Sequence, residues 1–177
     1  MKDLIFEWQN HLVRIRMVKT CKAFKISEDE KLGPFKEGDE VKLPYWKAKI
    51  FVDQNYAKFI DLKPIQTGDL HKILYRELPN PQLTPIDQNF YVKVYEDLLE
   101  LSEKYQKNPD LRLLQKIEKI KSLFRDVMSR RFYKLLRIAA AAPGKRSDIY
   151  QNCTNEEKKL LESLRKILEE WESQFLI

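Results

Sequence analysis

The sequence predicts an α+β protein, in which a mainly α-helical bundle domain follows a small antiparallel β-rich domain. Short alternating runs bounded by Gly and Pro occupy the first third of the chain, and these are typical of strands. Long amphipathic runs fill the second half, where Gly is nearly absent. Four prolines lie in the stretch that separates these two regions. We therefore expect a small domain at residues 1–63, a linker with one short helix at 64–85, and a helical domain at 86–177.

The small domain is expected to begin with a short helix at residues 3–10 and to hold four short strands. The clearest strand is the run LVRIRM at 12–17, where apolar and basic residues alternate, so that one face is buried. The other expected strands are 23–26, 39–43 and 57–60. Pro44 suits the first turn of a helix that continues to about Val52.

Three helices are expected in the helical domain. The first begins near Phe90, and the break at Asn108-Pro109 leaves Asp110 to cap a long central helix. The broad apolar stripe of this central helix indicates contacts with several neighbours. Thr154-Asn155-Glu156-Glu157 forms the capping box of a last helix. Its expected buried face consists of Leu160, Leu161, Leu164, Ile167, Leu168, Trp171 and Phe175.

The sequence argues against an enzyme. The two histidines, His11 and His71, have no acidic or cysteine neighbour at the spacing of a metal site or a catalytic triad. Cys21 and Cys153 lie far apart and are interpreted as free thiols. With four Gly in the chain, a phosphate-binding loop is hard to build. We expect no catalytic residue, no cofactor and no metal. With no apolar run of membrane-spanning length and no signal-peptide pattern, an intracellular protein is expected.

The positive charge is concentrated in one predicted helix. Residues 112–137 carry nine Lys or Arg and two acidic residues, a net +7, whereas the whole chain carries +6. Such a helix is typical of nucleic-acid binding, or of packing against acidic helices in its own bundle or in a partner. Charge alone leaves both alternatives open.

Arg131 lies at the centre of the apolar stripe of the central helix, at about 100° per residue. A buried guanidinium needs a carboxylate or backbone carbonyls, because an unpaired buried charge is costly. Either an ion pair inside the bundle, for example with a Glu of the last helix, or a contact with another subunit would supply them.

Three stretches resemble subunits of the GINS family. G-P-F-x-x-G at 33–38 and V-x-L-P-x-W at 41–46 resemble the small domain of its Psf-two branch. N-F-Y-x-x-x-Y-x-x-L-L at 89–99 is similar to a helix start of that family, and M-x-x-R-x-x-K-L at 128–135 to the centre of its long helix. The order of the domains resembles that of the Psf-two and Psf-three lineages, and of the single archaeal subunit that stands for both.

This resemblance implies a non-enzymatic subunit of a heterotetramer that acts in DNA replication. The partners implied are a second type of GINS subunit, the MCM replicative helicase and a RecJ-like (Cdc-forty-five type) protein. The assembly would bridge the last two and stimulate unwinding, in an archaeal cytoplasm at the nucleoid or in a eukaryotic nucleus. A weak DNA contact is compatible with it, and a membrane is not expected. The alternative is a stand-alone nucleic-acid-binding module that uses the basic helix at 112–137.

The resemblance also implies roles for individual residues. Arg131 and Lys134 match the family motif, and would hold the central helix to its neighbours by buried ion pairing in the bundle or at a subunit interface. Phe35, Tyr45 and Trp46 would be core or contact residues of the small domain.

Overall fold

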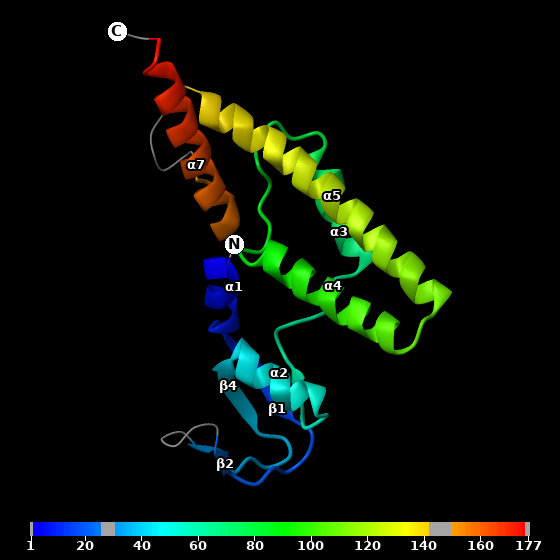
Figure 1. The fold of residues 1–177 in the computed structure, drawn as a ribbon. Coiled ribbons are helices and arrows are strands. Elements are labelled where there is room, and N and C mark those ends of the chain that lie inside the picture. The colour runs from blue at the N-terminus through cyan, green and yellow to red at the C-terminus, as the bar shows by residue number, and fades with distance from the viewer. Residues whose placement is uncertain (1, 26–30, 142–149, 176–177) are drawn as a thin grey trace. The chain divides into compact units, whose positions relative to one another are not determined.

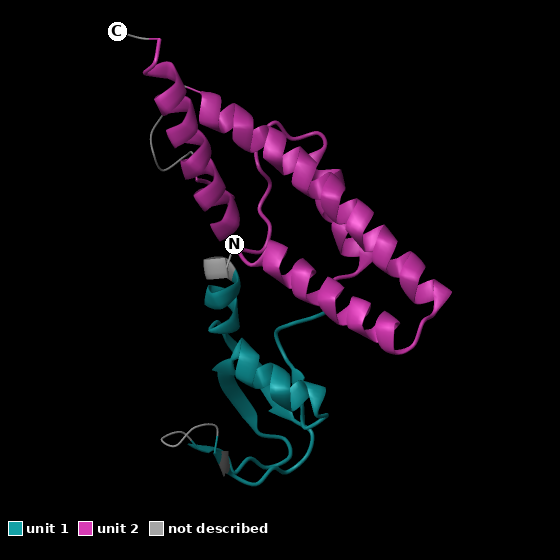
Figure 2. Cartoon of the chain, in the orientation of Figure 1, with its two compact units in different colours: residues 1–64 teal, residues 65–177 magenta. Residues whose placement is uncertain are grey.

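The fold class is confirmed by a computed structural model, which describes residues 2–25, 31–141 and 150–175. A small antiparallel sheet lies near the N-terminus and helices dominate the remainder. The chain forms two compact units, residues 1–64 and 65–177 (Figure 2). Each unit is described by itself.

Unit 1 is built around a three-stranded sheet with β1 in the middle, in the order β4-β1-β5 (Figure 1). Its elements are α1 (Lys2–Gln9), β1 (Leu12–Met17), β2 (Phe24–Lys25), β3 (Lys31–Leu32), β4 (Glu40–Pro44), α2 (Tyr45–Asp53) and β5 (Ala57–Phe59). Both neighbours of β1 are antiparallel to it, and Ile15 lies opposite Val41 on one side and Phe59 on the other. Val13, Ile15 and Met17 are buried while Arg14 and Arg16 are exposed, as the alternation in β1 predicts.

The part of unit 1 between β1 and α2 differs in detail from the prediction. Pro44 ends β4 and caps α2 instead of lying inside its first turn. The short strand β3 was not predicted, and Ile26 of the expected 23–26 strand lies outside the described residues. Gly33 and Gly38 have φ of 86° and 91°, a conformation that favours Gly.

Unit 2 consists of helices around one long central helix. Its elements are α3 (Thr67–Glu77), α4 (Phe90–Lys107), α5 (Leu111–Ala140) and α7 (Asn155–Glu172) (Figure 1). Asp110 caps α5 as predicted, since its side chain accepts a hydrogen bond from the backbone N–H of Arg112. The helices α3, α4 and α5 share one core of Leu70, Ile73, Phe90, Val94, Ile120, Leu123 and Val127. No helix among the described residues is long and apolar enough to cross a membrane.

The segment expected to be a linker, residues 64–85, belongs to unit 2 from Ile65 onward. Helix α3 packs along α5, and its Leu70 and Ile73 are buried. Leu83 and Thr84, between α3 and α4, are buried as well. The apolar residues of α3 recur at helical spacing and give it a face to bury, so the prolines around it bend the chain without separating it from the bundle.

The expected buried face of the last helix is largely exposed in this chain. Leu161 is buried, and Leu164 and Leu168 are half-buried. Ile167 and Trp171, in contrast, are 60% and 59% exposed. The reason is that α7 packs on α5, and a single neighbouring helix covers only a narrow side of it.

Candidate assembly site: a buried ion-pair cluster in the helical unit

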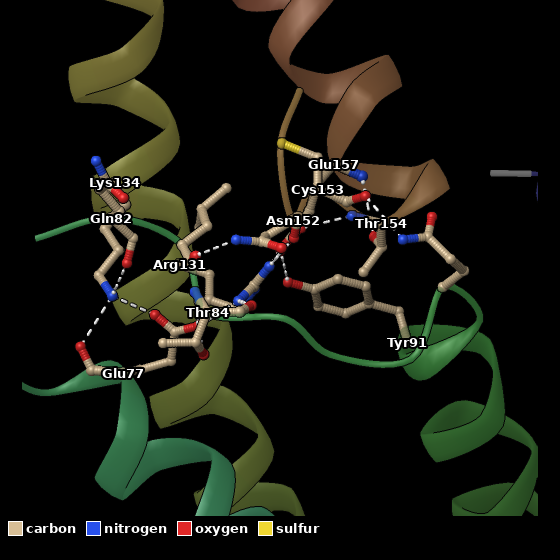
Figure 3. A network of polar contacts seen from close by, with 12 residues as sticks. Glu77, Gln82, Thr84, Tyr91, Arg131, Lys134, Asn152, Cys153, Thr154 and Glu157 are labelled. Carbon is tan, nitrogen blue, oxygen red and sulfur yellow. Dashed lines mark hydrogen bonds and ion pairs between the residues drawn. The ribbon is translucent and has the colours of Figure 1, made fainter. Parts of the chain in front are cut away.

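Four charged side chains meet inside unit 2 where α3, α5 and α7 come together (Figure 3). They are Arg131 and Lys134 from α5, Glu77 from α3 and Glu157 from α7, and we call them the ion-pair cluster. All four are buried, and Arg131 has no exposed surface. Two cations and two carboxylates balance one another, which reduces the cost of removing them from water.

Local sequence positions each member of the cluster. Arg131 and Lys134 are three residues apart on α5, so they project from the same side of the helix. Glu157 is held by the capping box of α7. There the Thr154 Oγ1 accepts from the Glu157 N–H at 3.3 Å, and the Glu157 Oε2 accepts from the Thr154 N–H at 2.9 Å. Glu77 is the last residue of α3, just before the chain turns back past α5.

Arg131 uses all five of its N–H groups. Its Nε donates to Glu157 Oε1 at 2.6 Å and its Nη2 donates to Glu157 Oε2 at 2.8 Å, a two-bond pair. Nη2 also donates to the carbonyl of Asn152 at 2.9 Å. Nη1 donates to Glu77 Oε1 and, at 2.9 Å, to the carbonyl of Thr84. A guanidinium has five donors, so none is left unsatisfied.

Lys134 is satisfied in the same way. Its ammonium donates to Glu77 Oε2, to the Glu77 carbonyl at 2.8 Å and to the Gln82 carbonyl at 2.9 Å. Thr84 adds two bonds to Glu77 Oε1, from its hydroxyl at 2.6 Å and from its backbone N–H at 3.1 Å. The carboxylate of Glu77 therefore joins α3, α5 and the segment before α4.

Two polar side chains extend the cluster to α4 and to the segment before α7. The Tyr91 hydroxyl donates to Glu157 Oε1 at 2.6 Å. The Asn152 amide donates to the Leu83 carbonyl at 3.0 Å, from a backbone with φ of 62°. Asn is among the residues that adopt this left-handed conformation most readily. All four described helices of unit 2 thus contribute a side chain to one hydrogen-bonded network (Figure 3).

The network shifts the pKa values of Glu77, Arg131 and Tyr91. Burial tends to raise the pKa of Glu77, but hydrogen bonds from Lys134 and Thr84 and the charge of Arg131 outweigh it and lower this pKa below its ordinary value. Burial tends to lower the pKa of Arg131, and Glu157 and Glu77 more than offset it. Burial and the charge of Glu157 raise the pKa of the Tyr91 phenol. The carboxylate of Glu77 is thus surrounded by groups that favour its charged form.

This arrangement fits a structural role better than a catalytic one. The charged groups are occupied by one another, and the nearby Cys153 thiol is buried, which together with the charge of Glu157 raises its pKa to about 11. Within the described parts of the chain, no group of three or more His, Cys, Asp or Glu could hold a metal ion. What the cluster does is fix α3, α4, α5 and α7 against one another.

The sequence pointed to two of the four members. Arg131 and Lys134 lie together as the family motif implied, and of the two alternatives for Arg131 the structure has the ion pair inside the bundle, with a Glu of the last helix. Glu77 and Tyr91 were not recognised as partners. Glu77 lies four residues after Ile73, in line with the apolar residues of a short helix, and this spacing could have indicated that its side chain is buried.

The small-domain candidates lie in unit 1. Tyr45 is buried, with its ring 5.0 Å from that of Trp8 and stacked at 5.7 Å on Phe59. Phe35 and Trp46 are half-buried. Phe35 makes an edge contact with Phe51 at 5.7 Å, and the Lys47 ammonium lies 5.1 Å from the centre of the Trp46 ring. Of the three, Tyr45 is the core residue.

The basic segment at 112–137 corresponds to most of α5. Two of its nine basic residues, Arg131 and Lys134, are inside the bundle, and Lys121 pairs with Glu118 of the same helix. The exposed members include Arg112, Lys119, Arg125, Arg130 and Arg137. Part of the charge is thus used for internal packing.

The model of the Sld5 family, described as the GINS complex protein helical bundle domain, matches residues 65–176, more than half of the chain. The chain belongs to the GINS family. The match begins at Ile65, where unit 2 also begins, so α3 and the ion-pair cluster lie inside the GINS helical bundle domain. Membership supports a role in the GINS replication complex, whose subunits are structural components that assemble with other GINS subunits. No curated protein matches the chain.

Proposed function

We propose that the chain is a non-enzymatic GINS subunit that, together with a second type of GINS subunit, forms a heterotetramer bridging the MCM replicative helicase to a RecJ-like protein. In this role it stimulates unwinding by holding the two proteins together. We further propose that it is of the Psf-two/Psf-three type, as the archaeal subunit that stands for both, and acts in the cytoplasm at the nucleoid.

The observation that carries this proposal is the match of the GINS helical bundle domain to unit 2. The order of the two units along the chain, with the β-rich unit first and the helical unit second, supports the Psf-two/Psf-three type. The ion-pair cluster supports a scaffold role, because a bundle whose helices are fixed by buried and fully bonded charges presents its outer faces in constant positions.

A reconstituted unwinding assay tests the proposed function. The MCM helicase is assayed on forked DNA alone, with the GINS complex that contains this chain, and with that complex plus the RecJ-like protein. We expect the unwinding rate to rise when the GINS complex is added and to rise further when the RecJ-like protein is also present. The chain alone, without its partner subunit, is the matched control and should not stimulate. An unwinding rate that the intact complex leaves unchanged would refute the proposal.

The exposed basic residues of α5 favour a second candidate, a stand-alone nucleic-acid-binding module. Its test is a salt titration with the isolated chain, since binding through several phosphate contacts weakens steeply as salt rises. Tight binding, at sub-micromolar Kd in about 150 mM salt, would favour this candidate, because non-specific binding at such salt is typically weaker than about 1 μM. Weak and salt-sensitive binding agrees with the scaffold role.

A further inference from the structure

Two rows of apolar side chains remain exposed on unit 2. On α7 the row is Leu160, Ile167 and Trp171, which are 38%, 60% and 59% exposed. On α5 it is Met128 and Phe132, 44% and 40% exposed, followed by the half-buried Leu136. Within each row the residues are four or seven apart, so each row runs along one side of its helix.

The two helices lie beside each other and run in the same direction. Arg131 of α5 contacts Glu157 of α7, Leu135 and Leu161 share one core cluster further along, and Arg165 donates to the Ile138 carbonyl at 3.4 Å beyond them. Contacts that advance together along both chains indicate parallel helices, and Figure 1 shows α5 and α7 ending at the same end of the unit.

The helical repeat places both rows on the same side of this pair. At about 100° per residue, the α5 row lies roughly 20–100° clockwise from Leu135, viewed from the N-terminal end. The α7 row lies roughly 80–120° anticlockwise from Leu161 in the same view. Leu135 and Leu161 mark where the helices contact each other. For two parallel helices, opposite rotations away from the line of contact point to the same side of the pair. The two rows therefore lie on one side of α5 and α7.

We call this surface the α5–α7 face, made of Met128, Phe132, Leu136, Leu160, Ile167 and Trp171. None of the six is charged, although 34% of the chain is. Aromatic residues and Met without charge are typical of the centre of a protein interface. From Leu160 to Trp171 the row is about 17 Å long, at 1.5 Å per residue. An occupant of that length and shape is an α-helix of three to four turns.

One polar atom indicates the chemistry of the occupant. Glu156 lies four residues before Leu160 and so continues the α7 row. Its Oε2 is buried and has no hydrogen-bond donor among the described residues. One oxygen of this carboxylate is unpaired while the side chain as a whole is only half-buried, so a Lys or Arg of an occupant can pair with it. A second copy of this chain would bring no cation from the same face, which favours a different subunit.

We propose that the α5–α7 face binds one amphipathic helix of a second GINS subunit, with the apolar side of that helix on this face and a Lys or Arg near Glu156. This inference rests on the proposed function and deepens it, since it assigns the partner to one face of the helical unit. Burial of Phe132 and Trp171 by that helix holds the two subunits together.

The test uses the tagged full-length chain in its own cells and measures the second GINS subunit recovered per chain by quantitative mass spectrometry. Phe132→Glu and Trp171→Glu are each expected to lower the recovery at least tenfold. The matched control is Tyr75→Glu on α3, where the side chain is 79% exposed, and it should stay within twofold of the unchanged chain. Circular dichroism and the melting temperature establish that each variant is folded.

A photo-crosslinking residue at position 171 gives a second measurement that adds no charge. An adduct with a helix of the second GINS subunit is expected. Variants that recover that subunit normally, or an adduct between two copies of this chain, would overturn the assignment of the face while the proposed function stands. If the unchanged chain recovers no other GINS subunit, the proposed function fails and this inference fails with it.

Discussion

Arg131 of α5 and Glu157 of α7 form a two-bond ion pair, with Nε–Oε1 at 2.6 Å and Nη2–Oε2 at 2.8 Å. The same carboxylate accepts from the Thr154 N–H in the capping box of α7. Glu157 therefore does two things at once, because the bond that begins α7 also orients the group that docks α7 on α5. Formation of this helix and its packing are coupled through one side chain.

Replacing Arg131 by Ala is expected to destabilise the helical unit strongly. The change leaves Glu77 and Glu157 buried without their shared cation, and breaking such a pair costs about 3–5 kcal/mol. Denaturant unfolding measures it, with the exposed neighbour Arg130→Ala as control at about 0.5 kcal/mol or less. A folded Arg131→Ala chain of normal stability, assembled normally with its partner, would contradict the role of the cluster.

Arg131→Lys separates charge from geometry. A lysine keeps the positive charge but offers three donors from one atom, so it cannot reproduce the five bonds of the guanidinium. We expect a free energy of unfolding between those of the unchanged chain and Arg131→Ala. Stability equal to that of the unchanged chain would mean that charge alone matters at this position.

The stability that Glu77 contributes should depend on pH in a defined direction. Its pKa is lower in the folded chain than the ordinary value of 4.5, so the folded state binds this proton less tightly than the unfolded state does. The contribution is complete above the unfolded pKa, near 4.5, and is lost as the pH falls through the lower folded pKa. The difference in unfolding free energy between the unchanged chain and Glu77→Gln should therefore be large at pH 7 and shrink below about 4.5. A difference that stays constant down to pH 3 would rule out the charged pairing of Glu77.

Thr154→Ala is expected to cost about 1–2 kcal/mol of stability. The change removes the Thr154 hydroxyl that accepts from the Glu157 N–H, and so loosens the residue that Arg131 binds. Ser163→Ala is the control on the same helix, since its hydroxyl only donates to the Lys159 carbonyl on the exposed side. Equal melting temperatures for the two variants would show that the cap does not support the ion pair.

The two thiols should react at different rates with a thiol reagent in the folded chain. Cys153 is buried, which together with the charge of Glu157 raises its pKa to about 11, so little of it is thiolate at pH 8. Cys21 is half-buried and should react first. We expect one fast thiol at pH 8 and two after unfolding, with Cys21→Ser abolishing the fast one. A fast reaction that survives in Cys21→Ser would show that the segment around Cys153 opens readily.

Local patterns explain which elements could be predicted from sequence. The alternation in β1, the cap at Asp110 and the capping box at Thr154 depend on residues close together in the chain, and all three were predicted correctly. The partners of Arg131 depend on residues 54 and 26 positions away, and no local pattern identifies which carboxylates will reach it. The two-residue strand β3 has too few residues to show a period.

The same limit explains the last helix. An apolar stripe predicts that a face will be covered but does not say by what. On α7 the stripe is wide, and α5 covers only part of it, around Leu161. The exposed remainder, with Ile167 and Trp171, is where the sequence-based prediction of a buried face was wrong for the single chain. It is also the surface that we assign to a partner.

The most direct measurement for a GINS subunit is the native mass and composition of the complex that the full-length chain forms in its own cells. Native mass spectrometry of the purified material is expected to give a heterotetramer with a second GINS subunit in equal amounts, accompanied by the replicative helicase. A lone monomer that holds nucleic acid tightly would contradict the scaffold role and would make the basic helix α5 the functional element.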